Sequence, residues 1–234
     1  MEAGKLSESV TKLYAAGNYK EALPLAERAL ALLEKARAEE DPLVGSALNN
    51  LAVLYLTLKH SGKALPILER ILARREKLKT TTSPMTMKLI MSYICLTIAK
   101  GISLRGKEVK LRGKEVKLTD RINAVLLQDA VLAAGLPIPD NLSELSTDII
   151  ISKPQPEYSA EAKWARLQGS VVVLAEADET GQVLSAEPVE CWLGQKPLAD
   201  AAAAALRKAR FKQVSINGKP IKVKAIAMYN FVLR

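Results

Sequence analysis

Apolar and polar residues alternate in the last third of the chain, in the pattern of strands that place one face on a core. Between residues 170 and 178, one face carries Val171, Val173, Ala175 and Ala177. Period-two alternation predicts a half-buried strand. The turn-forming run 178–181 follows, and apolar residues resume over 182–187, so we predict a β-hairpin.

A helix and a longer strand are predicted after the hairpin. Residues 198–212 are rich in alanine, and apolar side chains recur there every three or four positions, at Leu198, Ala202, Ala205, Leu206 and Ala209. The final strand alternates from Ile221 to Leu233. Before the hairpin, a short helix is expected over 159–167, with Ala162, Trp164 and Ala165 packed beside the hairpin. These elements predict an α+β domain of two helices on a small antiparallel sheet.

This ordered set of motifs resembles the C-terminal domain of the TonB energy-transducer family. The matching segments are QPEYSAEAKWARLQGSVVV, DETGQV, PLADAAAAALRKARFKQ and the terminal YNFVLR. Two positions depart from the family pattern: Ser159 follows Tyr158 where the family has proline, and residues 191–198 replace a Ser-Gly-His-Pro-Leu segment. The resemblance implies that the domain recognises a short extended segment, the box of an outer-membrane transporter's plug, by strand addition. It also implies energy transduction or transport across a bacterial cell envelope.

The resemblance places the partner on two parts of the domain. The expected docking edge is the terminal strand, with residues Ile221, Lys222, Val223, Lys224, Ala225, Ile226, Ala227, Met228, Tyr229, Asn230 and Phe231. The leading segment, Gln155, Pro156, Glu157 and Tyr158, matches the family's Gln-Pro-x-Tyr segment that touches the box. Its alternative role is a connector that anchors Tyr158 in the core. Lys222 and Lys224 could instead protect the edge against strand addition.

The N-terminal part contains an internal repeat. EALPLAERAL at Glu21–Leu30 matches KALPILERIL at Lys63–Leu72, an offset of 42 residues. Helical spacing between these segments resembles tetratricopeptide repeats of the kinesin-light-chain kind, with packing positions at Leu48, Leu51, Ala52, Tyr55, Ala64, Leu68 and Ile71. A third repeat begins at Pro84 and keeps only its first helix, with Ile90, Tyr93 and Ile94 as its buried residues. Such units stabilise one another by stacking.

Tetratricopeptide repeats bind extended peptides on a concave face lined by their first helices. In this chain the candidate groove residues are Asn49, Asn50, Val53 and Leu56. The side-chain amides of the two asparagines would hold a peptide backbone. The alternative is that Asn49 and Asn50 are ordinary polar surface residues.

An exact tandem duplication connects the two parts. RGKEVKL occurs at Arg105–Leu111 and again at Arg112–Leu118. Two glycine-containing heptads are too few for a coiled coil. The alternatives are a solvated linker, an anionic-lipid contact, or pairing of one copy with the C-terminal sheet. A helix is predicted from about Arg121 to Ala134, with Ile149–Ile151 as a short strand after it.

Composition excludes several classes of function. The net charge is +9, but aromatic residues make up only 4% and no nucleic-acid recognition motif is present, so specific nucleic-acid binding is not expected. No catalytic, cofactor or metal motif occurs, and the single histidine, His60, lies between two predicted helices. The two cysteines, Cys95 and Cys191, follow no metal spacing, and we expect buried free thiols rather than a disulfide. No transmembrane run or signal peptide is visible.

The predicted organisation is an all-α repeat domain at 1–103, a basic linker with one helix at 104–150, and the TonB-like α+β domain at 151–234. The first hypothesis is a non-enzymatic TonB-type protein that binds a protein or peptide partner in the periplasm or cell envelope, without excluding the cytoplasm. The second is a repeat scaffold whose TonB-like domain only docks or forms a homodimer.

Overall fold

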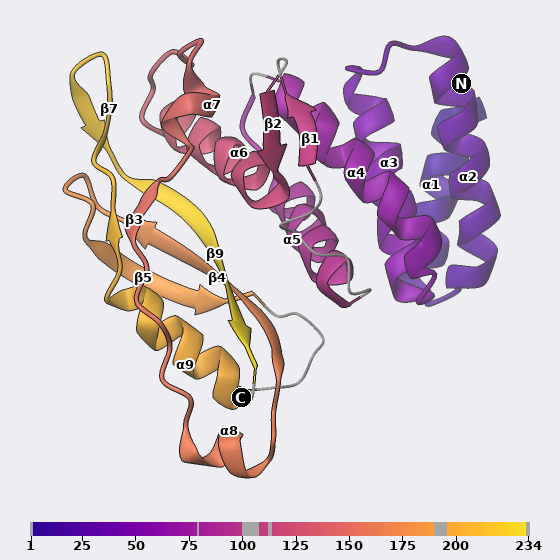
Figure 1. Ribbon diagram of the computed structural model, residues 1–234. Helices are drawn as coiled ribbons and strands as arrows, with labels where there is room; N and C mark the ends of the chain where they lie inside the picture. The colour runs from indigo at the N-terminus through magenta and orange to yellow at the C-terminus, as the bar shows by residue number, and fades with distance from the viewer. Residues whose placement is uncertain (1, 79, 100–107, 112–113, 190–195, 233–234) are drawn as a thin grey trace. The chain divides into compact units, whose positions relative to one another are not determined.

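The computed structural model describes residues 2–78, 80–99, 108–111, 114–189 and 196–232 (Figure 1). The chain divides into two compact units. One comprises Met1–Leu78 with Thr82–Leu96, and the other comprises Lys79–Thr81 with Thr97–Arg234. The first is helical, and the second combines helices with antiparallel strands.

Consecutive antiparallel helices build the N-terminal unit. They are α1 (Glu2–Ala15), α2 (Tyr19–Ala36), α3 (Pro42–Thr57), α4 (Ser61–Lys77) and α5 (Pro84–Ala99). The packing positions predicted on α3 and α4 are all buried: Leu48, Leu51, Ala52, Tyr55, Ala64, Leu68 and Ile71. On α5, the predicted Ile90, Tyr93 and Ile94 are buried as well, as expected for the first helix of a third repeat.

The repeated motif also pairs helices through hydrogen bonds. Glu27 and Glu69 occupy equivalent positions in the two copies. Tyr55 Oη on α3 donates to Glu27 Oε1 at 2.6 Å, and Tyr93 Oη on α5 donates to Glu69 Oε2. Burial and the Glu27 carboxylate raise the pKa of Tyr55 to about 12. Each copy therefore fixes a tyrosine of the next repeat.

Among its described residues, the C-terminal unit contains four helices and four small sheets. Its helices are α6 (Leu118–Ala133), α7 (Leu142–Leu145), α8 (Ala160–Trp164) and α9 (Lys196–Arg207). Its strands are β1 (Glu108–Leu111), β2 (Lys114–Lys117), β3 (Ile150–Ser152), β4 (Gly169–Ala177), β5 (Val183–Pro188), β6 (Arg210–Phe211), β7 (Val214–Ile216), β8 (Lys219–Ile221) and β9 (Val223–Phe231).

The main sheet has three antiparallel strands in the order β5-β4-β9, and α9 covers one of its faces (Figure 1). Odd-numbered residues of β4 and β9 form the core against this helix, because side chains alternate between the faces of a strand. Val173 and Ala175 of β4 are fully buried, as are Leu198 and Ala202 of α9. The small alanines let the helix approach the sheet closely.

Three local predictions were wrong. The alanine-rich helix ends at Arg207 rather than near 212, because Phe211 is buried in the core and pairs with β3 through β6. The predicted continuous terminal strand is interrupted at Lys222, between β8 and β9. Trp164 does not pack beside the hairpin: it is the last residue of the five-residue α8, and its side chain is 89% exposed.

The two RGKEVKL copies pair with each other. β1 and β2 form their own two-stranded antiparallel sheet, so the alternative in which one copy pairs with the C-terminal sheet was wrong. The register places Glu108 opposite Lys117 and Lys110 opposite Glu115.

The predicted helix after the duplication exists as α6 and belongs to a core. Its Leu127 and Val131 are fully buried in the cluster that also contains residues of β4, β9 and α9. Gly135, at φ +69°, follows the helix end. The segment expected as a linker therefore supplies part of the C-terminal core.

The cysteine prediction was wrong for Cys95. This residue is 8% exposed and disulfide-bonded. The other cysteine, Cys191, lies outside the described residues, as do residues 192–195 of the segment that departs from the TonB pattern.

Candidate functional site

β9 is an edge strand of the main sheet, paired on one side with β4. In an antiparallel strand, the backbone groups of alternate residues point toward the partner strand and away from it. Val172 lies opposite Met228, and its carbonyl accepts a hydrogen bond from Val189 on the β5 side. Met228 therefore directs its N–H and C=O away from β4, as do the other even-numbered residues of β9. We define the free edge as the outward backbone groups of Lys224, Ile226, Met228 and Asn230.

The middle of the free edge is covered by α6. The backbone N–H of Ile226 donates to Asn123 Oδ1 at 2.8 Å, and this contact is buried. Ile226 itself is 2% exposed on the face of the sheet opposite α9. Since a buried N–H without a partner is costly, the Asn123 amide is a stable part of the fold.

A second side chain caps the free edge two residues further on. Lys153 Nζ, just beyond β3, donates to the carbonyl of Met228 at 3.1 Å, in an exposed contact. The same ammonium lies 5.1 Å from the centre of the Tyr229 ring, within range of a cation–π interaction.

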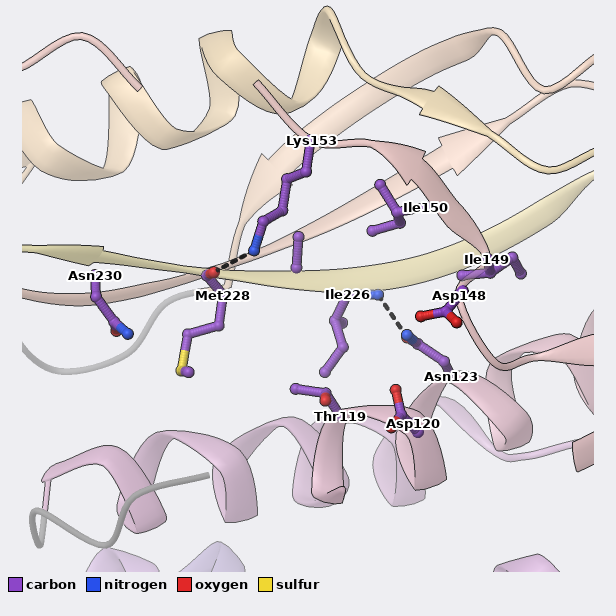
Figure 2. Close-up of a pocket in the computed structure, with 11 residues that line it drawn as sticks. Thr119, Asp120, Asn123, Asp148, Ile149, Ile150, Lys153, Ile226, Met228 and Asn230 are labelled. Carbon is purple, nitrogen blue, oxygen red and sulfur yellow. Dashed lines mark hydrogen bonds between the residues drawn. The ribbon is translucent and has the colours of Figure 1, made fainter. Parts of the chain in front are cut away.

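A cavity of about 290 Å³ lies along this edge. Figure 2 shows β9 between the first turns of α6, which bear Thr119, Asp120 and Asn123, and the segment that carries Asp148 to Lys153. The β9 residues on its wall include Ile226, Met228 and Asn230. The cavity thus combines outward backbone groups with carboxylate, amide and ammonium side chains.

The side chains of the two lysines that the sequence suggested as protectors of the edge have other positions. Lys224 Nζ forms an ion pair with Glu176 Oε2 at 3.4 Å, directly across the β4–β9 pairing. Lys222 is exposed between β8 and β9. The lysine that caps the free edge is Lys153, which sequence reasoning missed because it lies 75 residues before Met228.

The opposite edge of the sheet, on β5, is a poorer site for an added strand. Pro188 at its end has no N–H to donate. The outward carbonyl of Ala186 accepts a hydrogen bond from Arg207 of α9 at 3.2 Å.

The leading segment is anchored to the core rather than to the cavity. Tyr158 Oη donates to the carbonyl of Leu167, and its ring packs edge-to-face on Phe231 with centroids 5.5 Å apart. Gln155 and Glu157 are exposed, Pro156 is half-buried, and none of the four residues lines the cavity. Ser159, where the family has proline, caps α8 by accepting from the Ala162 N–H at 3.1 Å.

The candidate groove residues on α3 have mixed roles. Asn49 Nδ2 donates to Thr86 Oγ1 on α5 at 2.9 Å, so this amide joins two helices. Asn50 is exposed, while Val53 and Leu56 are half-buried.

The described part of the chain has no group of three or more metal-ligating side chains of the His, Cys, Asp or Glu types. No helix within it is long and apolar enough to span a bilayer. His60 precedes α4 as its N-cap residue, and its ring lies 6.3 Å from that of Tyr55.

Two family models match the chain. Residues 12–77 match the tetratricopeptide repeat, and residues 154–233 match the Gram-negative bacterial TonB protein C-terminal model. No curated protein and no solved structure matches the chain significantly. The packing residues predicted on α3 and α4 and the predicted hairpin fall within these two spans. The chain therefore carries a segment similar to tetratricopeptide repeats at residues 12–77, followed by one similar to a TonB C-terminal domain at residues 154–233.

Proposed function

We propose that the TonB C-terminal domain binds an extended partner segment by strand addition to β9. The partner is the box of an outer-membrane transporter, and the process is energy transduction or transport across the cell envelope. The observation that carries this proposal is the cavity of about 290 Å³ beside the outward backbone groups of an edge strand. An added strand would satisfy those groups with its own N–H and C=O groups.

The geometry favours the second half of the strand as the docking segment. At Ile226 the outward N–H is already paired with Asn123 in a buried contact. Met228 is half-buried and Asn230 is exposed, so an incoming strand has access to both. The proposed site is therefore narrower than the range Ile221–Phe231 that the sequence suggested, and it centres on residues 228–231.

The location we propose is the periplasm or the surface of the cell envelope. The TonB model that matches residues 154–233 supports it. The disulfide at Cys95 supports it independently. Disulfides persist in the oxidising periplasm and are rare in the reducing cytosol.

The direct test is an NMR titration of the full chain, with backbone amides labelled. One probe is a synthetic transporter-box segment, and the other is a capped peptide of about seven alternating valines and threonines, chosen for β propensity. We expect shift changes concentrated at residues 228–231. A spectrum that does not move at millimolar peptide would contradict strand addition.

A proline substitution tests whether the backbone is the contact. Met228→Pro removes an outward N–H without removing a hydrogen bond to β4, and proline is tolerated at such edge positions. Met228→Ala keeps the N–H and removes the side chain. Loss of binding in the proline variant with retention in the alanine variant is the expected result. Equal affinities for both variants would exclude β9 as the added-strand site.

A second candidate function is a scaffold in which the repeats hold the partner. The specific observation in its favour is that Asn123 and Lys153 both cap the free edge of β9. The tetratricopeptide-repeat match at residues 12–77 provides the alternative surface. In the same titration, this function would move amides near Asn50 and Val53 and leave residues 228–231 unchanged.

A further inference from the structure

We infer that Lys153 controls access of the partner strand to β9, an inference that rests on the proposed function. The Lys153 cap, defined as the hydrogen bond from Lys153 Nζ to the Met228 carbonyl, occupies an acceptor that an added strand needs. Binding of the strand and closure of the cap are therefore mutually exclusive at Met228.

The competition concerns one backbone oxygen. The Met228 carbonyl points away from β4, where an incoming N–H would meet it. The Lys153 ammonium already donates to it at 3.1 Å, and Figure 2 shows the lysine reaching across from the end of β3. An incoming strand must displace the ammonium before its own N–H can take this acceptor.

The two caps of the free edge differ in how readily they open. The Asn123 contact is buried, and Asn123 lies on a helix that supplies two core residues. Breaking this hydrogen bond would leave the Ile226 N–H buried without a partner. The Lys153 contact is exposed, on a long side chain with several rotatable bonds. Water can solvate both the displaced ammonium and the displaced carbonyl. Lys153 is thus the exchangeable cap, and Asn123 is the fixed limit of the site.

The displaced ammonium has a second position close by. It lies 5.1 Å from the Tyr229 ring centre while the cap is closed, so a small rotation keeps the cation–π contact after the carbonyl is released. Closing again requires no change in the backbone of β3. The cap is a reversible competitor that lowers the affinity for every extended segment, whatever its sequence.

The test compares Lys153→Met with the wild-type full chain. Methionine keeps an unbranched side chain and removes the donor. Because a single net hydrogen bond of this kind corresponds to about two- to tenfold in affinity, we expect the variant to bind the capped valine–threonine peptide tighter by about that factor. Lys208→Met, an exposed lysine at the end of α9, controls for the lost positive charge.

A second readout is the carbonyl carbon shift of Met228 in the free protein. It should move in Lys153→Met and stay in place in Lys208→Met. If the wild type binds the peptide at residues 228–231 but Lys153→Met binds it no more tightly, control of access by Lys153 is refuted. Strand addition to β9 would then still hold. Absence of binding in both the wild type and the variant at millimolar peptide would overturn both.

Discussion

Asn123 on α6 and Ile226 on β9 are joined by a buried hydrogen bond of 2.8 Å, across 103 positions of sequence. Asn123 lies outside the span that matches the TonB C-terminal model, and Ile226 lies inside it. The same helix contributes Leu127 and Val131 to the core of the C-terminal unit. The α6 helix thus completes the core of the C-terminal unit, and its Asn123 limits the free edge of β9 at one end.

The first prediction concerns the stability that this contact provides. Asn123→Ala leaves the Ile226 N–H buried without a partner, so we expect the free energy of unfolding to fall by about 1–3 kcal/mol. Chemical denaturation followed by circular dichroism measures it. Asn141→Ala is the matched control, because the Asn141 side chain is exposed and makes no capping bond to α7, and its effect should stay within about 0.5 kcal/mol. Equal losses in the two variants would contradict the assignment.

A second prediction separates a steric clash from backbone strain. Gly181 and Gly218 both have positive φ, at +82° and +78°. A Cβ at Gly181 would lie 2.2 Å from the Phe211 carbonyl oxygen, whereas one at Gly218 would meet no atom within 4 Å. Gly218→Ala should cost about 1–2 kcal/mol from its backbone conformation alone.

Gly181→Ala should cost at least about 1 kcal/mol more, because the β6 backbone has to move. Thermal melts of the two variants provide the comparison. If Gly181→Ala were no less stable than Gly218→Ala, the close approach between this turn and β6 would be refuted.

The third prediction is a loss of stability at alkaline pH. Burial raises the pKa of Tyr229 from 10.0 to about 12. The folded state holds this proton more tightly than the unfolded state, so the contribution is complete below pH 10 and is lost as pH rises from 10 to 12. Tyr229→Phe should therefore flatten the decline of the unfolding free energy across this window.

At neutral pH the same substitution should not destabilise the protein. Tyr229 Oη has no hydrogen-bond partner among the described residues, so its removal leaves no group unsatisfied and should raise stability by up to about 1 kcal/mol. Tyr55→Phe is the contrast, because its hydroxyl donates to Glu27, and it should lose about 1 kcal/mol. A destabilised Tyr229→Phe at pH 7 would indicate a partner for this hydroxyl.

Periodicity predicted the elements whose side chains face one local core. The alternation in residues 170–178 and the alanine-rich helix from Leu198 are both present, and the predicted residues are buried except Val171, which is half-buried. Such patterns depend only on neighbours along the chain. They carry no information about the direction of a side chain on a helix as short as α8. The exposure of Trp164 could therefore not be predicted from the pattern.

The candidate site was predicted only in part. The pattern identified the terminal strand. It could not show which backbone edge of that strand remains unpaired, because strand order depends on contacts between residues that are far apart in the sequence. One signal for the cover by α6 was present: Ile226 and Met228 are apolar on a face that also carries Lys222, Lys224 and Asn230. An apolar residue there indicates a second packing element, and Asn123 supplies the contact. The Lys153 cap had no comparable signal.

The last prediction concerns the thiols. Cys95 is disulfide-bonded, so protein isolated without reductant and unfolded in denaturant should show fewer reactive thiols than the two cysteines of the chain. Titration with a thiol reagent should give at most about one equivalent before reduction and about two equivalents after it. Two equivalents in unreduced wild-type protein would contradict the disulfide, and would also remove its support for a periplasmic location.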